Sequence, residues 1–291
     1  MAYIRTPGYI FRQIRLTLNQ LTKDVSPANV KLLRTSVRRL EARLALAFTE
    51  EKMAEHGKLL GRLDTLRKLA GKVRDLDVQI AALKSLAMGA VRMHRQQVMH
   101  ELEDKRQKRE RKLLKEIART NDERFVKQMR RLQVEWSAAY QPAQGKLATA
   151  QAMLDDLVLE HKILAEHDLS KRNIHAFRLL AKQVRYTAEL ALTGTKKTDE
   201  EAERFVASME TVTDAIGDWH DWMTLEAAAA KVLASATHSP LTSALRNLTQ
   251  AKLRAAIQTA ADVTRQLATD SGGRKPLRRA VTGNEESAQS A

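Results

Sequence analysis

The chain has 291 residues, of which 43% are hydrophobic, so it is long enough to bury a core as one large domain or two smaller halves. It contains no cysteine, which excludes a disulfide framework and thiolate metal sites and fits a reducing compartment. No apolar run approaches the ~20 residues that span a bilayer, and the N-terminus has no signal-peptide core. A cytoplasmic protein without membrane insertion is therefore predicted.

Composition predicts an all-α fold. The chain has only 11 glycines and 5 prolines, aromatic residues make up 4%, and runs of Ala, Leu, Arg, Lys, Glu and Gln dominate. These residues lose little conformational freedom in a helix. Lysine and arginine total 50 against 35 aspartates and glutamates, a formal charge of +15. Because a compact body with this charge repels itself, an anionic partner is expected.

In the first half, a helix is expected over residues 8–25. Ser26 and Pro27 then supply an N-cap and a first-turn proline for a second helix that runs to about residue 48. Further helical segments are expected at 53–72, 73–90 and 91–138, the last being a highly charged, exposed helix or helix pair.

The helical pattern breaks between Tyr140 and Gly145, which indicates two halves, 8–140 and 146–268. Helices of the second half are expected at 146–166, 171–193, 198–216, 218–235 and 241–268. The polar segment 269–291 is rich in Ser, Gly, Gln and charged residues and is expected to be a disordered tail. The folded domain is therefore predicted to span 8–268.

Two pairs of segments indicate an internal repeat. The segment from Lys31 to Arg38 aligns with the segment from His175 to Lys182, at an offset of 144. Gly71-Lys-Val-Arg-Asp aligns with Gly217-Asp-Trp-His-Asp at an offset of 146. The similar offsets favour a duplication, with two helical halves related by a pseudo-twofold axis.

One helix of each half carries a stripe of cations. At about 100° per residue, Lys31, Arg34 and Arg38 fall within about 60°, and Leu33, Val37, Leu40 and Leu44 lie on another face. In the second half, His175, Arg178, Lys182, Arg185 and Tyr186 share about 100°, opposite Phe177, Val184 and Ala188. Such stripes are commonly solvated surface. Here they contain almost no acids and are rich in arginine, whose planar fork suits phosphate, so two facing stripes are predicted to line a groove or pore for a linear phosphate chain.

These residues resemble the conserved histidine α-helical domain (CHAD) family. The resemblance covers about residues 8–268 and rests on four motifs in the family's order. They are Arg34-Thr-Ser-Val-Arg38-Arg39-Leu40, Arg74-Asp75-Leu76-Asp77-Val78, His175-x-x-Arg178-x-x-x-Lys182-x-x-Arg185-Tyr186, and Ile216-Gly217-Asp218-Trp219-His220-Asp221. The resemblance implies paired helical bundles, inorganic polyphosphate held in a basic central pore, and association with polyphosphate granules. No catalytic residue and no cofactor are predicted, because the sequence has no glycine-rich phosphate loop, nucleophile elbow or Cys/His pairing.

Site residues follow from the resemblance position by position. The implied phosphate contacts are Arg34, Arg38, Arg39, Arg178, Lys182 and Arg185, with Lys31 as an addition and His175 and Tyr186 as hydrogen-bonding neighbours. Arg74, Asp75 and Asp77 are expected to form ion pairs that fix the bundle or orient the cations. Asp218 and Asp221 are expected to cap a helix or to orient lysine and arginine side chains. Lys31 departs from the family by replacing its first-half histidine, which keeps a cation but removes a titrating imidazole.

Catalysis and metal binding find little support in the sequence. Glu101-Leu-Glu103-Asp-Lys105 matches the Glu-x-Glu-x-Lys motif of triphosphate tunnel enzymes, but that motif needs a strand and the surroundings are helical. His94 and His100 are six residues apart, as are His161 and His167, so neither pair shares one helix face at the i, i+4 spacing. No metal site is predicted.

Two other binding functions remain open. A basic helical nucleic-acid-binding protein is the alternative, because the charge and the segment from Lys105 to Lys115 would permit it. Few aromatic residues are available to stack on bases, and a narrow pore would exclude them. A scaffold for acidic proteins or anionic lipid is the third reading, although the chain offers no dedicated anchor.

Overall fold

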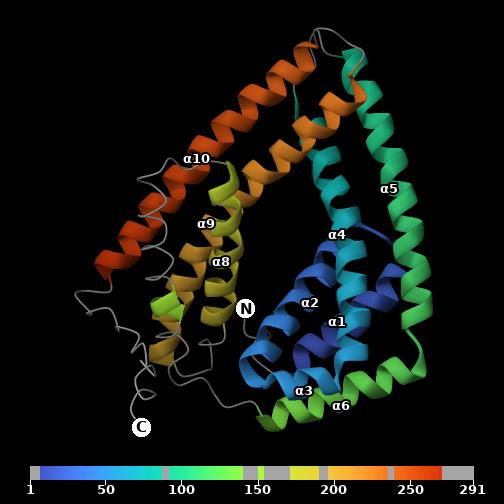
Figure 1. Cartoon of the computed structure of the whole chain (residues 1–291), viewed down its shortest axis with the longest axis vertical. Coiled ribbons are helices and arrows are strands. Elements are labelled where there is room, and N and C mark those ends of the chain that lie inside the picture. Colours follow the sequence, from blue (N-terminus) through green and yellow to red (C-terminus); the bar gives the residue numbers. More distant parts are fainter. Residues whose placement is uncertain are drawn as a thin grey trace, which may run out of the picture.

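A computed structural model describes residues 7–86, 92–139, 150–153, 171–189, 196–234 and 239–270, and within these ranges the chain is α-helical without any strand (Figure 1). The helices of the first half are α1 (Pro7–Leu21), α2 (Pro27–Ala47), α3 (Glu50–Glu55), α4 (Gly57–Ser85), α5 (Arg92–Thr120) and α6 (Glu123–Ala139). Those of the second half are α8 (Lys171–Glu189), α9 (Lys196–Val232) and α10 (Pro240–Asp270). The all-α prediction is confirmed.

The first half has a hydrophobic core of its own. Helices α1, α2, α4, α5 and α6 surround it, and Phe11, Phe125 and Trp136 are its largest members. From residue 92 on, the segment expected at 91–138 is a helix pair, α5 and α6, interrupted at Asn121 and Asp122. The Asp122 carboxylate accepts a hydrogen bond from the Phe125 amide, 2.6 Å away, and so caps the start of α6. At α2, Ser26 caps the helix and Pro27 occupies its first turn, as predicted.

The second half packs α8, α9 and α10 around a separate core. Its members include Phe177, Met209, Ile216 and Trp219, all nearly inaccessible to solvent. The long helices α9 and α10 run as a hairpin in the same way that α4 and α5 do in the first half (Figure 1). Each half therefore buries apolar surface on its own.

A third apolar cluster joins the halves. It combines Ile80 and Leu83 of α4, Val98 and Leu102 of α5, and residues of α9 and α10 such as Leu225 and Leu245. The cluster lies toward the top of Figure 1, where the two hairpins converge. Elsewhere α2 and α4 of the first half face α8 and α9 of the second. The two halves, each with its own core, therefore lie side by side, joined by this cluster at one end and by contacts between α2 and α8.

The helix boundaries predicted near Gly71 and Gly217 are wrong. Residues 53–90 were expected as two segments, yet α4 continues from Gly57 to Ser85. The helices expected at 198–216 and 218–235 are the single helix α9. A glycine inside a helix costs only about 1 kcal/mol, which apolar packing along both helices outweighs. The first helix also ends earlier than expected, at Leu21.

The predicted duplication has a parallel in the helix order. The order α2, α4, α5 in the first half matches α8, α9, α10 in the second. A Cβ atom added to Gly71 would lie 3.5 Å from Nε of Arg34, and one added to Gly217 would lie 3.6 Å from a terminal nitrogen of Arg178. The duplication and its pseudo-twofold axis stay predictions. The break at 140–145, most of the helix expected at 146–166 and most of the tail at 269–291 lie outside the described residues.

Gly61 offers a test of the continuous helix α4. It is exposed, and nothing lies within 4 Å of an added Cβ atom. Gly61→Ala should raise the free energy of unfolding by about 0.5–1 kcal/mol, because alanine loses less backbone entropy on entering a helix. Thermal unfolding followed by circular dichroism measures the change. A lower melting temperature in the variant would contradict a regular helix at this position.

Candidate functional site

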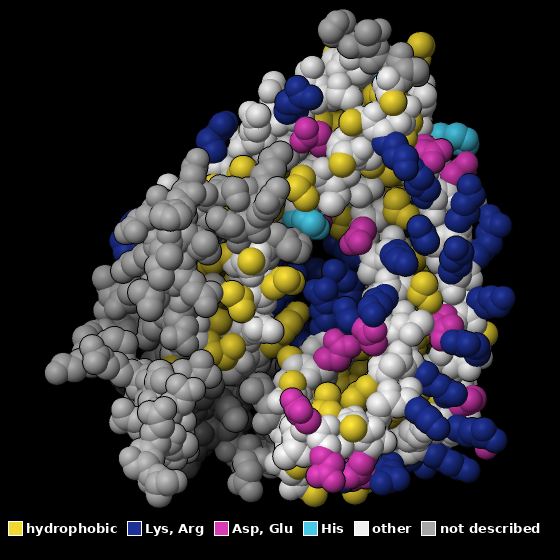
Figure 2. All heavy atoms as spheres, in the orientation of Figure 1, with side chains coloured by type: hydrophobic (Ala, Val, Ile, Leu, Met, Phe, Trp, Pro, Cys, Tyr) yellow, Lys and Arg dark blue, Asp and Glu magenta, His cyan; other side chains and the backbone are white. Residues whose placement is uncertain are grey.

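A cavity of about 730 Å³ lies between the two halves. Helices α2 and α4 supply one side of it, and α8 and α9 supply the other. Figure 2 shows lysine and arginine side chains gathered inside a hollow near the middle of the molecule. We call this space the central cavity. Its lining residues are Lys31, Arg34, Thr35, Arg38, Arg39, Arg74, Asp75, Val78, Arg178, Leu179, Lys182, Arg185, Tyr186, Glu210, Thr213, Asp214, Gly217, Asp218, His220 and Asp221.

Amphipathic α2 places its cations in the central cavity. Its apolar face, including Leu33, Val37 and Leu40, is fully buried in the first core. At the helical period, burial of this face turns Arg34 and Arg38 toward the second half. Lys31, one turn earlier on the same stripe, is exposed at the edge.

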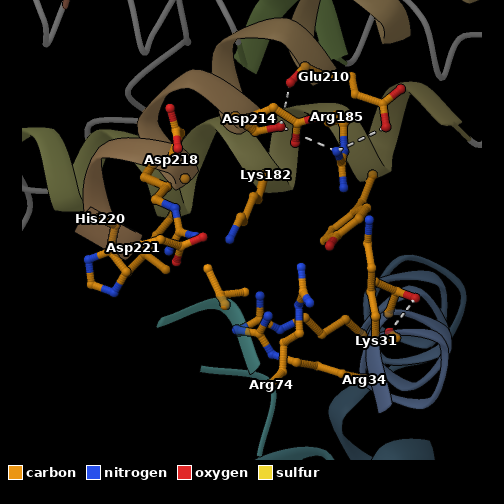
Figure 3. A pocket seen from close by; sticks show the side chains of 18 of the residues that line it. Lys31, Arg34, Arg74, Lys182, Arg185, Glu210, Asp214, Asp218, His220 and Asp221 are labelled. Carbon is orange, nitrogen blue, oxygen red and sulfur yellow. Dashed lines mark hydrogen bonds and ion pairs between the residues drawn. The ribbon is translucent and has the colours of Figure 1, made fainter. Parts of the chain in front are cut away.

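Helix α8 presents the second set of cations. Phe177, Ala181 and Val184 are buried in the second core. Arg178, Lys182 and Arg185 therefore face the cavity, as do Leu179 and Tyr186. In Figure 3 the Lys182 side chain extends from α8 into the space between the two halves. The two cationic stripes thus line one shared cavity.

Two lining cations are held by carboxylates. Arg39 of α2 donates through Nε to Glu189 of α8 at 3.0 Å and through a second nitrogen at 3.3 Å, and the Glu189 side chain is only 7% exposed. Arg185 donates to the Thr213 hydroxyl at 3.2 Å and lies 3.8 Å from Glu189 and from Glu210. Its guanidinium also lies 5.0 Å from the centre of the Tyr186 ring. These contacts tie α2 to α8 and α8 to α9.

Six other cations that line the cavity have no such partners among the described residues, in contrast to Arg39 and Arg185. Within the described part of the chain, their side chains form no ion pair or hydrogen bond. They are Lys31, Arg34, Arg38, Arg74, Arg178 and Lys182. Nε of Arg178 is fully buried without a partner. The cavity therefore concentrates positive charge and unpaired hydrogen-bond donors, an arrangement that is chemically suited to an anionic ligand.

The cations perturb one another. Burial lowers the pKa of Arg34, Arg38 and Arg178, and neighbouring guanidinium groups lower each of them further. Arginine keeps its proton despite such shifts. The effect on Lys182 is larger, because burial together with the charges of Arg178, Arg38, Arg34 and Arg185 lowers its pKa to about 7. An anion in the cavity would reverse this repulsion.

Carboxylates at the rim moderate the positive charge. Asp75 of α4 is accessible to solvent, yet the surrounding protein desolvates it and raises its pKa against the pull of Arg34 and Arg178. Desolvation likewise raises the pKa of Asp221 on α9, against the pull of Arg178 and Arg74. Asp218 is held by Lys252 of α10, 2.7 Å away. The acids therefore leave the centre of the cavity cationic.

The family model for the CHAD domain matches residues 9–230, which is more than half of the chain. The chain belongs to the CHAD domain family. CHAD domains are associated with polyphosphate binding in general, and they usually bind or regulate rather than catalyse.

Two solved structures share the fold of this CHAD domain. The crystal structure of the CHAD domain from the plant Ricinus communis aligns with a TM-score of 0.62 at 14% identity, covering 92% of this chain and 90% of that one. PptA from Streptomyces chartreusis aligns with a TM-score of 0.55 at 16% identity, covering 91% of this chain and 99% of that one. No curated protein matches the sequence. No described helix is long and apolar enough to cross a membrane.

The central cavity of this CHAD domain collects most of the residues singled out in the sequence. Eight predicted phosphate contacts line it: Lys31, Arg34, Arg38, Arg39, Arg178, Lys182, Arg185 and Tyr186. The side chain of His175, in α8, lies outside the described ones. Arg74, which was expected to act through ion pairs, is itself an unpaired lining cation. Sequence reasoning also missed Glu189, the partner of Arg39, because a lone glutamate at a helix end carries no signal.

Asp77 forms its ion pair within the first half and is not among the residues that line the cavity. Its carboxylate accepts from Nε of Arg106 at 2.7 Å, and Arg106 also contacts Glu110 and the Val25 carbonyl. Asp77→Ala should lower the free energy of unfolding by about 2–3 kcal/mol, less than for an enclosed pair because the Arg106 side chain is 20% exposed. Thermal unfolding checks this. Glu103→Ala, which removes an exposed pair with Lys84, is the control and should cost under about 1 kcal/mol.

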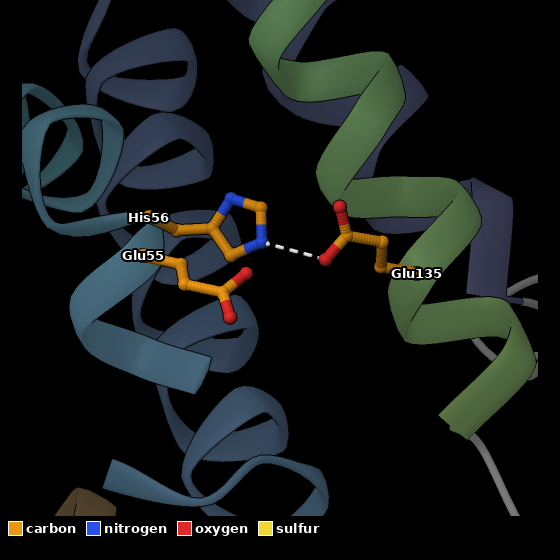
Figure 4. Close-up of side chains that lie close together, drawn as sticks. All are labelled: Glu55, His56 and Glu135. Carbon is orange, nitrogen blue, oxygen red and sulfur yellow. Dashed lines mark hydrogen bonds and ion pairs between the residues drawn. The ribbon is translucent and has the colours of Figure 1, made fainter. Parts of the chain in front are cut away.

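A cluster outside the cavity has the residue types of a metal site. Glu55, His56 and Glu135 lie within reach of one ion, and Nε2 of His56 is 3.0 Å from Glu135 (Figure 4). The Lys52 ammonium, however, lies 2.9 Å from Glu55 and 3.0 Å from Glu135. Hydrogen bonds from Arg131, Lys52 and His56 hold the pKa of Glu135 at about 2. Protein cations thus already neutralise these carboxylates, and we assign no metal to them.

The Glu101-x-Glu103-x-Lys105 motif lies on helix α5. Lys105 pairs with Glu101 one turn away at 2.9 Å, and Glu103 faces Lys84 of α4 at 3.8 Å. The three side chains therefore do not converge as they would on a strand.

Proposed function

We propose that this protein binds inorganic polyphosphate in the central cavity, between α2 and α8, and associates with polyphosphate granules in the cytoplasm. The observation that carries the proposal is the set of six unpaired cations from both halves around one cavity. Polyphosphate offers negative charge on every residue of a linear chain, so a single molecule can accept from cations of both stripes. Arg34 and Arg38 would bind it on one side, and Arg178 and Lys182 on the other.

The lining favours bare phosphate over nucleic acid. Apart from the imidazole of His220, Tyr186 carries the only aromatic ring among the described residues that line the cavity. The guanidinium of Arg185 already lies over the Tyr186 ring. Proteins that hold single-stranded nucleic acid stack successive bases on aromatic side chains. A cavity of about 730 Å³ with one such ring has no corresponding platform.

Nucleic-acid binding stays the alternative because of the outer surface. Exposed or half-buried cations without an ion pair among the described residues follow the outer side of α5 and α6 (Figure 2). They are Lys108, Arg109, Arg111, Lys112, Lys115, Arg124, Lys127 and Arg130. Such a surface would attract any polyanion through its phosphates.

Titration calorimetry separates the two functions. The purified protein is titrated with long-chain polyphosphate, single-stranded RNA and duplex DNA at matched phosphate concentration and physiological salt. Clear preference for polyphosphate is expected, with affinity that falls as salt rises because counterions are released. Equal or tighter binding of either nucleic acid would overturn the proposal in favour of the alternative.

A further inference from the structure

Lys182 is an amine placed among arginines. It extends from α8 into the central cavity, and no described carboxylate pairs with it (Figure 3). The charged groups that face it are Arg34 and Arg38 from α2, and Arg178 and Arg185 from α8. Asp75 of α4 and Asp221 of α9 also line the cavity, but neither forms an ion pair with Lys182.

The position of Lys182 in an open cavity, among arginines and without a carboxylate partner among the described residues, favours a reactive amine. Burial first, and then the four arginines, lower the pKa of Lys182 to about 7, so its amine is neutral in about half of the molecules at pH 7. An ordinary lysine is neutral in roughly one molecule in three thousand at that pH. Desolvation next to other cations is an established way of activating a lysine amine. The same arginines would concentrate a small anionic electrophile beside it.

We propose that Lys182 is a modification site for small acyl phosphates, which bind with their phosphate on the cavity arginines and transfer their acyl group to Nζ. The Nζ lone pair forms a bond to the acyl carbon, and the bond from that carbon to the phosphate oxygen breaks. Inorganic phosphate leaves with the electron pair and takes the proton released by the nitrogen. The product is a neutral amide on Lys182, and nothing is oxidised or reduced.

Acylation would reduce polyphosphate binding, a consequence that rests on the proposed function. It removes one cation from the stripe on α8 and fills part of the cavity with the acyl group. Polyphosphate in turn would protect Lys182, because it would occupy the cavity and cover the amine. Binding and acylation would therefore be mutually exclusive.

The test is acylation of the full chain with acetyl phosphate at pH 7, with site-by-site rates from peptide mass spectrometry. Lys72 and Lys231, both exposed, are internal references in the same molecule. Lys182 should be acetylated at least about tenfold faster than either, because of its larger neutral fraction. Comparable rates at all three lysines would overturn the proposal.

Acetic anhydride separates guidance by the arginines from simple reactivity, since it is uncharged. The preference for Lys182 over Lys72 should be larger with acetyl phosphate than with the anhydride, and an equal preference would refute phosphate binding by the arginines.

Excess polyphosphate should suppress acetylation at Lys182 and leave the acetylation rate of Lys72 unchanged. Preferential acetylation that polyphosphate fails to suppress would keep the modification site and count against the proposed function. Polyphosphate binding without preferential acetylation would do the reverse.

Discussion

Replacing Arg34 and Arg178 together by glutamine is expected to weaken polyphosphate binding by about a hundredfold or more. Each arginine has no ion-pair partner among the described residues, and each comes from a different half. A hydrogen bond to a charged group contributes about 1.5–3 kcal/mol, and every 1.4 kcal/mol is about tenfold in affinity. Calorimetric titration of the double variant with long-chain polyphosphate measures the loss.

The matched control removes the same charge from the outer surface. Arg111→Gln with Lys115→Gln changes two exposed cations of α5 that have no ion pair among the described residues. This variant should lose less than about tenfold, since each surface charge contributes mainly long-range attraction that salt screens. Equal losses in both double variants would show that net charge, and not the cavity, determines affinity. Melting temperatures of both variants exclude a loss of fold.

Polyphosphate binding is expected to weaken as the pH rises above 7. The pKa of Lys182 is about 7 in the free protein, and bound polyanion raises it toward the ordinary lysine value. Binding above pH 7 therefore takes up a proton, and affinity falls by up to about tenfold for each pH unit until the pKa of the complex is reached. Calorimetry at pH 8 in two buffers of different ionisation enthalpy should report uptake of nearly one proton per site.

Arginine at position 182 is the control for this linkage. Lys182→Arg keeps the positive charge but cannot titrate in this range, so proton uptake on binding should disappear. The free energy of unfolding of the free protein changes with pH in the opposite direction to the affinity for polyphosphate. Because the folded pKa of Lys182 is below its unfolded value, this residue adds to the stability of the free protein as the pH rises from 7 toward 10. Affinity that stays constant between pH 7 and 9 would contradict the assignment.

The site was predictable from sequence where it depends on periodicity within one helix. Burial of Leu33 and Val37 on α2, and of Phe177 and Val184 on α8, follows from the helical period and determines which cations face the cavity. Pairing across the halves does not follow in this way. Arg39 and Glu189 are 150 residues apart, so nothing local shows that this arginine already has a carboxylate partner.

The helix boundaries were predicted wrongly for a related reason. Gly71 and Gly217 favour a break locally, but apolar contacts along α4 and α9 outweigh the small cost of a glycine in a helix. The contact between His56 and Glu135 was likewise invisible, because it joins the start of α4 to α6 across 79 residues. Local pattern predicted the faces of the helices, whereas tertiary packing decided their length and their partners.

A polyphosphate chain bound as proposed would have a mechanical role, because the two halves have separate cores. Each half has a core of its own, and besides the apolar cluster at one end the contacts between the halves include the bidentate pair of Arg39 on α2 with Glu189 on α8. A phosphate chain bound to both α2 and α8 would act as a crosslink between two folding units. Its binding free energy would then oppose their separation, so that the polymer becomes part of the tertiary structure of the protein that holds it.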